Sequence, residues 1–300
     1  MDKEILDSYL KAGKIAKECL QFGAGLIKPG VLVVEVCDKV EEKIQSMGGG
    51  IAFPAQVAIN NVAAHFCPTE DDTTSFKEGD VCSLDIGVHI NGYVADTATT
   101  VDLGDNASLV QASRDALDAA LALVKPGVPV NELGRAIHKA ITARGFSPIK
   151  NLSGHGLDQY TVHTSPTIPN FDTGHKLELK DGMVFAIEPF ATDGGGSIFE
   201  SNSPTVFGFV RKKGVRSPYA RALLSDIEKY NGLPFTTRWL SRKHGIAKTN
   251  FGLRELIKQD IIREYPPLVE IKDGIVSQAE HSVLIHDGKV IVYTLKSSLI

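Results

Sequence analysis

The chain has 300 residues, a formal net charge of −4 and an apolar content of 43%. A chain of this length and apolar content can bury a large core. No stretch approaches the ~18 uninterrupted apolar residues of a membrane-spanning helix, and the charged start MDKEILDSYLKAGK lacks the apolar centre of a signal peptide. We therefore expect a globular cytoplasmic protein without a membrane partner.

The cysteines and the charges add two further expectations. Four cysteines lie in the first third of the chain without a CxxC pair or zinc-ribbon spacing, so we expect buried thiols at Cys19, Cys37, Cys67 and Cys82. Residues 211–265 hold thirteen basic and five acidic residues, a net charge of +8, while the remainder of the chain carries −12. The sequence predicts an acidic body that carries a basic insert.

An internal repeat organises the chain. The segment GLIKPGVLVVEVCDKVEEKIQSMG, from Gly25, matches ALVKPGVPVNELGRAIHKAITARG, from Ala122. Each copy predicts a Pro-Gly turn followed by an amphipathic helix that ends at a glycine, Gly48 or Gly145. The apolar residues that recur at every fourth position are Val36, Val40 and Ile44 in the first copy and Leu133, Ile137 and Ile141 in the second.

The likeness continues beyond these helices. HFCPT at His65 aligns with HTSPT at His163, and FKEGDVCSLD aligns with LKDGMVFAIE. This alignment sets Asp85 against Glu188, 103 positions later, so a carboxylate is predicted at the end of the same strand in both copies. Two such units related by an approximate two-fold axis are expected to pack their strands into one curved sheet covered by helices, with equivalent residues near the axis.

A β-hairpin is predicted in LDIGVHINGYVADTATTV, where apolar and polar residues alternate on both sides of Asn91-Gly92. A two-residue turn sets Asp85 opposite Ala98, with Asp96 two residues away on the same face. Diagonal neighbours of this kind have Cβ atoms roughly 7 Å apart, so both carboxylates can reach one metal site. The alternative is that both aspartates are solvated strand residues.

Two histidines and a glutamate extend this group. LSGHGLDQYTVH places His155 and His163 eight residues apart, although a single histidine is more often a satisfied polar group than a ligand. Near the carboxyl end, IVSQAEHSVLIHDGKVIVYTL predicts two strands joined by Asp287-Gly288, with Glu280 inside a strand-like run. A buried acid there needs a partner.

A metal pair gives a physical reason to assemble these groups. Four carboxylates and one imidazole suit manganese, iron or cobalt, and zinc is tolerated. Four carboxylates close together would otherwise repel one another and stay partly protonated. We therefore expect two divalent ions held by Asp85, Asp96, His155, Glu188 and Glu280.

At these residues the chain resembles the methionine aminopeptidase family, and the resemblance covers essentially the whole chain. The order Asp, Asp, His, Glu, Glu matches the five-ligand signature of the family, including the spacing of eleven between the aspartates. The family's two further site histidines fall on His65, in NNVAAHFCP, and on His163, in YTVH. The resemblance implies an α+β pita-bread fold with a pseudo-two-fold internal repeat.

The resemblance also points to the type II subclass in its archaeal form, because Glu280 follows Glu188 by 92 positions. It implies a catalytic domain at 1–205 and 270–300, with a basic, helical, winged-helix-like insertion at 206–269. We expect helices in this insertion near Leu233–His244 and Asn250–Ile262.

By the same resemblance, the activity is hydrolytic removal of the initiator methionine from nascent proteins, with preference for a small second residue. Asp85 would ligate one ion, His155 and Glu188 the other, and Asp96 and Glu280 both. Glu188 would act as general base, His163 would donate a hydrogen bond to the oxyanion, and His65 would sit beside the scissile amide. The substrate-binding residues would be His65, His163 and the apolar residues Phe53, Val162, Phe190 and Tyr265.

Several alternatives stay open. Xaa-Pro aminopeptidases and prolidases share the five ligands but carry a separate amino-terminal domain. Some pita-bread homologues are non-catalytic ribosome- or RNA-binding proteins, and a basic insert would suit such a role. Without the family likeness, ordinary core packing is the better reading of the aromatic residues. A monomer is the default expectation, and ribosome association could accompany catalysis.

Overall fold

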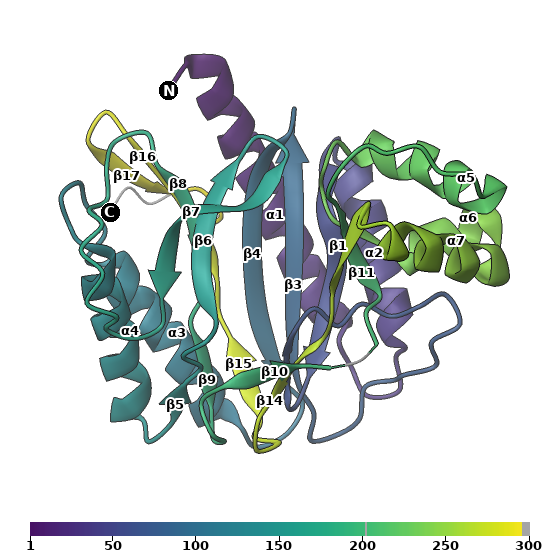
Figure 1. Cartoon of the computed structure of the whole chain (residues 1–300). Helices are drawn as coiled ribbons and strands as arrows, with labels where there is room; N and C mark the ends of the chain where they lie inside the picture. The colour runs from purple at the N-terminus through teal and green to yellow at the C-terminus, as the bar shows by residue number, and fades with distance from the viewer. Residues whose placement is uncertain (202, 296–300) are drawn as a thin grey trace.

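The computed structural model describes residues 1–201 and 203–295. Two related halves form the body, with helices on the outside and strands facing one another across the centre (Figure 1). The first half contains α1 (Lys3–Leu26), α2 (Val33–Ser46), β1 (Gly50–Ile59), β2 (Val62–Ala64), β3 (Val81–Ile90) and β4 (Tyr93–Asp102). The second half begins with α3 (Ala107–Leu121), α4 (Val130–Ala143), β5 (Ser147–Pro148), β6 (Ser153–Asp158), β7 (Thr161–Pro169), β8 (Val184–Ile187), β9 (Phe190–Thr192) and β10 (Ile198–Glu200).

The repeat predicted from the sequence is present in three dimensions. All six apolar positions of the paired helices α2 and α4 are at most 1% exposed, which confirms the predicted inner faces. Gly79 and Gly182, which precede the equivalent strands β3 and β8, have φ of 89° and 85°. An L side chain is strained at such angles, so both copies need glycine to make the same turn.

The strands form two principal sheets instead of the single curved sheet that was expected. β1, β3 and β4 make one antiparallel sheet, and the order of the other is β17-β16-β8-β6-β7. The two sheets adjoin where β4 passes β16. The hydrogen bonds across this seam run largely through the side chains of Thr97 and Ser282, so no continuous ladder forms.

The final strands of the body are β14 (Leu268–Glu270), β15 (Val276–Gln278), β16 (His281–His286) and β17 (Lys289–Val292). β14 begins inside the insertion expected at 206–269, but it pairs with β10 and β2 of the body. Glu280 was expected inside a strand, but it lies in the break between β15, which pairs with β9, and β16, which pairs with β8. The two halves also differ at the aligned carboxylates. Asp85 lies in the middle of β3, whereas Glu188 directly follows β8 and precedes Pro189, which lacks a backbone N–H donor.

The residues between Val206 and Tyr265 have a sheet and a hydrophobic cluster of their own. They form β11 (Val206–Phe209), α5 (Pro218–Ile227), the 3-10 turn η1 (Glu228–Tyr230), β12 (Phe235–Thr236), α6 (Thr237–His244), α7 (Ile246–Lys258) and β13 (Ile262–Tyr265). Two helices were expected near Leu233–His244 and Asn250–Ile262. The first begins later because Phe235 and Thr236 pair with β11, and the second begins at Ile246, directly after Gly245. The sequence interpretation missed α5, which Ser217 caps by accepting the N–H of Ala220.

The cysteines and the hydropathy of the helices were also predicted from the sequence. The four cysteines are free and buried, as predicted. No helix in residues 1–201 and 203–295 is long and apolar enough to cross a membrane.

Candidate metal centre

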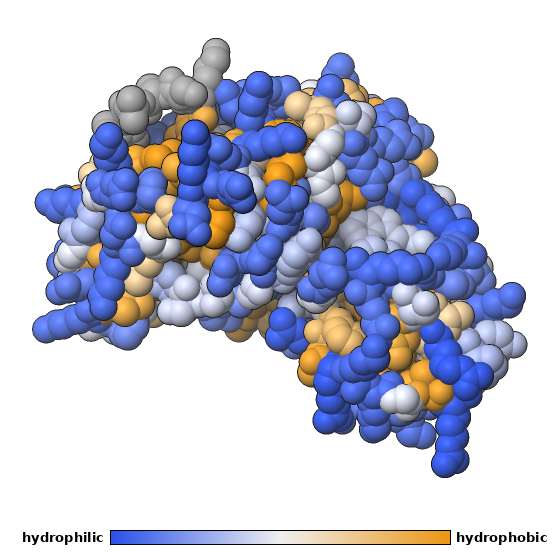
Figure 2. Space-filling view, turned by 90° about the horizontal axis from the view of Figure 1, so that it is seen from above, coloured by the Kyte–Doolittle hydropathy of each residue, from blue (hydrophilic) through white to orange (hydrophobic). Residues whose placement is uncertain are grey.

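A cavity of about 480 Å³ lies between the two halves of the body and the insert. Seen from above, the molecular surface is hollowed between the body and the lobe on the side of the inserted helices (Figure 2). The residues that line the cavity include all five predicted metal ligands, namely Asp85, Asp96, His155, Glu188 and Glu280. Among residues 1–201 and 203–295, no lysine or arginine lines it.

The β3–β4 hairpin brings Asp85 and Asp96 together. Asn91 and Gly92 form its two-residue turn with φ of 54° and 89°. Asp85 pairs with Ala98, as the turn length predicted, and Asp96 pairs with Gly87. Asp85 and Gly87 are two residues apart on β3, so the two aspartates lie on the same face of the sheet.

The seam between the halves adds Glu280 to this pair. Ser282 Oγ accepts the N–H of Asp96 at 2.9 Å and donates to the Asp96 carbonyl at 2.7 Å. Glu280 N donates to Ala98 O at 3.1 Å, and Thr97 Oγ1 donates to Glu280 O at 2.9 Å. These bonds fix the backbone of Glu280 beside the hairpin that carries the two aspartates.

His155 and Glu188 enter from the second half of the body. His155 Nε2 lies 3.4 Å from Glu188 Oε1 and 3.7 Å from Asp96 Oδ2. The flanking glycines permit close strand packing, because a Cβ at Gly154 would lie 2.3 Å from the Ala186 carbonyl oxygen. A Cβ at Gly156 would lie 2.1 Å from the Ser165 carbonyl oxygen.

Burial makes the carboxylates of this cavity hard to ionise. It raises the pKa of Asp85 to about 7. Burial and then the charge of Asp85 raise the pKa of Asp96 well above its usual value. For Glu188 and Glu280 burial again comes first, followed by repulsion from Asp96 and Asp85, and both pKa values are raised. Burial lowers the pKa of His155 to about 4, so its imidazole is neutral and offers a lone pair.

This donor set fits divalent cations. Asp96, His155 and Glu280 each offer one donor atom within 4.8 Å of the others. Within the described part of the chain, Asp85 Oδ1, Asp96 Oδ1 and Glu280 Oε2 are buried without a hydrogen-bond partner. Buried anionic oxygens without partners are costly, and cations held among them would remove both the repulsion and the unmet hydrogen-bonding capacity.

The two additional histidines lie beside the carboxylates. The ring centroids of His155 and His163 are 4.4 Å apart, and Tyr265 lies 5.7 Å from His65 and 6.1 Å from His163. Burial, followed by the charges of His155, His65 and Arg263, lowers the pKa of His163 to about 3. Burial also lowers the pKa of His65. Each ring is therefore neutral near pH 7 and has one N–H to donate.

The apolar part of the cavity contains three of the four expected pocket residues. Phe53, Val162 and Tyr265 line it, but Phe190 does not. The Phe190 ring is 1% exposed and packs with Ala63, Ile149 and Val276. Glu188 and Phe190 would share a face on a regular strand, but the chain breaks between β8 and β9, so the ring turns away from the cavity.

Sequence interpretation missed several residues of the cavity wall. Gln56, Val206, Pro234 and Leu268 also line it. Val206 and Pro234 belong to the predicted insert, where Val206 pairs with Tyr265 and Pro234 directly precedes β12. Only the folded insert brings them to the site. Gln56 is three residues after Phe53, so on a regular strand the two side chains would point to opposite faces. Strand alternation therefore did not predict that Gln56 lines the cavity.

Comparisons with known proteins agree with this geometry. Residues 7–217 match the model of metallopeptidase family M24. The chain is 44% identical over 295 residues to a methionine aminopeptidase of Archaeoglobus fulgidus, covering 98% of this chain and 100% of that protein. Among solved structures, a methionine aminopeptidase of Thermotoga maritima aligns with a TM-score of 0.72 at 22% identity, covering 99% of this chain and 98% of that one.

A thermophilic Arx1 aligns with a TM-score of 0.88 at 16% identity, covering 99% of this chain and 92% of that one, and this likeness shows the fold alone. The full-length match at 44% identity and the family model carry the assignment. The chain belongs to metallopeptidase family M24 and groups with its archaeal methionine aminopeptidases.

Proposed function

We propose that this metallopeptidase removes the initiator methionine from nascent proteins and prefers a small second residue. The observation that carries the proposal is the meeting of Asp85, Asp96, His155, Glu188 and Glu280 at one cavity that also has an apolar wall. A hydrolytic centre beside a pocket for an unbranched apolar side chain is what this activity requires. The archaeal relatives named methionine aminopeptidase support the same reading.

The centre would hold two divalent ions. Asp85, Asp96, His155, Glu188 and Glu280 would hold them. Oxygen-rich donors of this kind favour manganese, iron or cobalt and tolerate zinc. When bound, the ions would supply Lewis-acid activation of water and of the scissile carbonyl.

The protein's own groups would move the proton and stabilise charge. Glu188 would accept the proton of the attacking water as general base and deliver it to the leaving amine. His163 would donate a hydrogen bond to the developing oxyanion, an interaction that strengthens in the transition state. The neutral state that burial imposes on His163 fits a hydrogen-bond donor and disfavours a role as proton acceptor. His65, whose Nδ1 lies 3.3 Å from the Pro266 carbonyl oxygen, would sit beside the scissile amide.

The methionine side chain would enter the apolar wall formed by Phe53, Val162 and Tyr265. A flexible thioether gains dispersion and sulfur–aromatic contacts with such rings. His65 and His163 would border the same pocket on the metal side. Because nascent chains would be the substrates, the enzyme would act in the cytoplasm. A monomeric state and contact between the basic insert and the ribosome remain predictions from the sequence.

A peptide assay tests the proposed substrate class. Metal-free protein supplied with Mn(II) or Co(II) is expected to release methionine from Met-Ala-Ser and to leave Ala-Pro-Ser intact. Product analysis by chromatography measures both reactions. Cleavage of Ala-Pro-Ser in place of Met-Ala-Ser would favour a proline-directed peptidase, and cleavage of neither peptide would favour a binding protein.

Substitution of single ligands tests the assigned roles. Loss of residues that merely orient metal ligands costs about 10- to 100-fold, so Asp85→Ala and Glu188→Ala are each expected to lower kcat/KM by at least about 100-fold. The folded structure should persist, as measured by circular dichroism. Asp181→Ala is a matched control, because Asp181 lies with His286 and Asp287 in a second acidic cluster that is more exposed. Full activity in either ligand variant would contradict the roles.

The pKa shifts predict how pH affects the metal-free protein. Carboxylates titrate near pH 4 in an unfolded chain, whereas the pKa of Asp85 is about 7 in the folded protein and those of Asp96, Glu188 and Glu280 are also raised. The folded state then binds more protons than the unfolded state above about pH 4, so the free energy of unfolding falls as pH rises from about 5 to about 8.

Thermal unfolding of the metal-free protein across this range measures the effect. Mn(II) should restore the unfolding temperature at the upper end. The double variant Asp96→Asn, Glu280→Gln should show a shallower decline, because two titrating groups are gone. An unfolding temperature that does not fall with pH, or an equal slope in the double variant, would refute the interpretation.

A further inference from the structure

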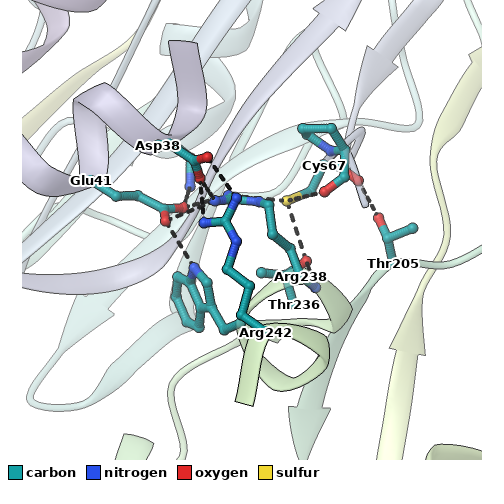
Figure 3. A network of polar contacts seen from close by, with 10 residues as sticks. Asp38, Glu41, Cys67, Thr205, Thr236, Arg238 and Arg242 are labelled. Atoms are coloured by element: carbon teal, nitrogen blue, oxygen red, sulfur yellow. Dashed lines mark hydrogen bonds and ion pairs between the residues drawn. The ribbon is translucent and has the colours of Figure 1, made fainter. Parts of the chain in front are cut away.

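A charge network, buried at Arg238 and Glu41, joins the insert to the body (Figure 3). Arg238, on α6, is 0% exposed and forms ion pairs with Asp38 and Glu41 on α2. Its Nη2 lies 2.7 Å from Glu41 Oε1, and its Nη1 lies 3.1 Å from Glu41 Oε2. Arg242 adds two contacts to Asp38, at 2.8 and 2.6 Å. Two cations thus balance two anions.

Glu41 also contacts the strand that forms one wall of the cavity. Its Oε1 accepts the backbone N–H of Ala55 at 3.1 Å, and its Oε2 accepts the indole N–H of Trp239 at 2.8 Å. Ala55 lies between Phe53 and Gln56, which both line the cavity. One carboxylate therefore holds the insert and the β1 wall together.

Strand β1 is irregular at this point. Phe53 pairs with Gly87 and Gln56 with Asp85, so β1 has one residue more than β3 over this stretch. On a regular strand Phe53 and Gln56 would point to opposite faces, but the bulge turns both toward the face of Asp85. The Phe53 ring lies over Gly87, where a Cβ would come within 2.3 Å of a ring carbon. Glu41 supplies an acceptor to the N–H of Ala55 inside this bulge.

The same network reaches the wall made by the insert. Thr236, the N-cap of α6, accepts the N–H of Arg238 at 3.4 Å and pairs with Val206 on β11. Val206 pairs in turn with Tyr265, and both of these residues line the cavity. Arg238 is therefore linked through Thr236 and Val206 to the apolar wall on the insert side.

We propose that Glu41 and Arg238 are positioning residues that set the selectivity of the methionine pocket. The pair fixes the bulge that presents Phe53 and anchors the insert strands that present Tyr265, so it defines the width of the pocket without touching substrate. A buried ion pair adds little net stability over an apolar pair but demands one geometry. This inference rests on the proposed function for the identity of the substrate.

The double variant Glu41→Leu, Arg238→Met removes both charges and the acceptor for Ala55, so it leaves no unpaired buried charge. Against Met-Ala-Ser it is expected to raise KM about 10-fold while kcat changes less than about threefold, because chemistry at the metal centre is untouched. The preference for Met-Ala-Ser over Leu-Ala-Ser should fall about 10-fold, since a looser pocket discriminates shape poorly. Hydrogen exchange of the segment 53–57 should accelerate.

The control is Glu132→Leu, Arg135→Met, which applies the same substitutions to an exposed ion pair on α4 at 2.9 Å. It should leave KM, selectivity and exchange unchanged. A milder variant, Glu41→Gln, keeps an oxygen for Ala55 and removes one charge, and it should raise KM about threefold. It carries the test if the double variant does not fold.

Wild-type KM and selectivity in a folded Glu41 variant would overturn the proposal, as would equal changes in the control. If the wild-type protein cleaves neither peptide, the proposed function fails. Hydrogen exchange then tests by itself whether Glu41 and Arg238 hold the β1 segment in place. Faster exchange at 53–57 in the variants then supports the positioning role, and unchanged exchange contradicts it.

Discussion

The repulsion among four carboxylates is the constraint on which the rest of the structure depends. Asp85, Asp96, Glu188 and Glu280 share one cavity that no lysine or arginine of the described part of the chain lines, and the only imidazole among the five predicted ligands is held neutral by burial. Several of their oxygens have no hydrogen-bond partner among the described residues. Such a group is stable and ionised only around cations. The family to which the chain belongs is metal-dependent, as this arrangement requires.

The two halves and the insert contribute to the cavity in different ways. The duplicated body brings carboxylates from both copies to the seam, where side chains of Thr97 and Ser282 fix the backbone of Asp96 and Glu280. The insert contributes Val206, Pro234 and Tyr265 to the apolar wall. Pocket shape thus depends on how the insert is held against the body, so we expect the buried contacts of Arg238 to affect the proposed specificity as well as the packing.

Much of this site could be predicted from the sequence because local rules fix it. The Asn91-Gly92 turn determines the register of its hairpin, and the repeat equates Asp85 with Glu188. The residues that were misplaced or missed lie where the chain departs from regular geometry. Pro189 interrupts the strand that would have aimed Phe190 into the pocket, and a bulge in β1 aims Gln56 there. Tertiary contacts accompany such irregularities, such as the hydrogen bond from Ala55 N–H to Glu41, and no local pattern encodes them.

Anomalous diffraction from crystals grown with Mn(II) tests the central claim most directly. We predict two manganese ions per chain, ligated by Asp85, Asp96, His155, Glu188 and Glu280, with Asp96 and Glu280 contacting both. An occupied centre elsewhere, or a cavity that holds no ion while its carboxylates stay protonated, would contradict it.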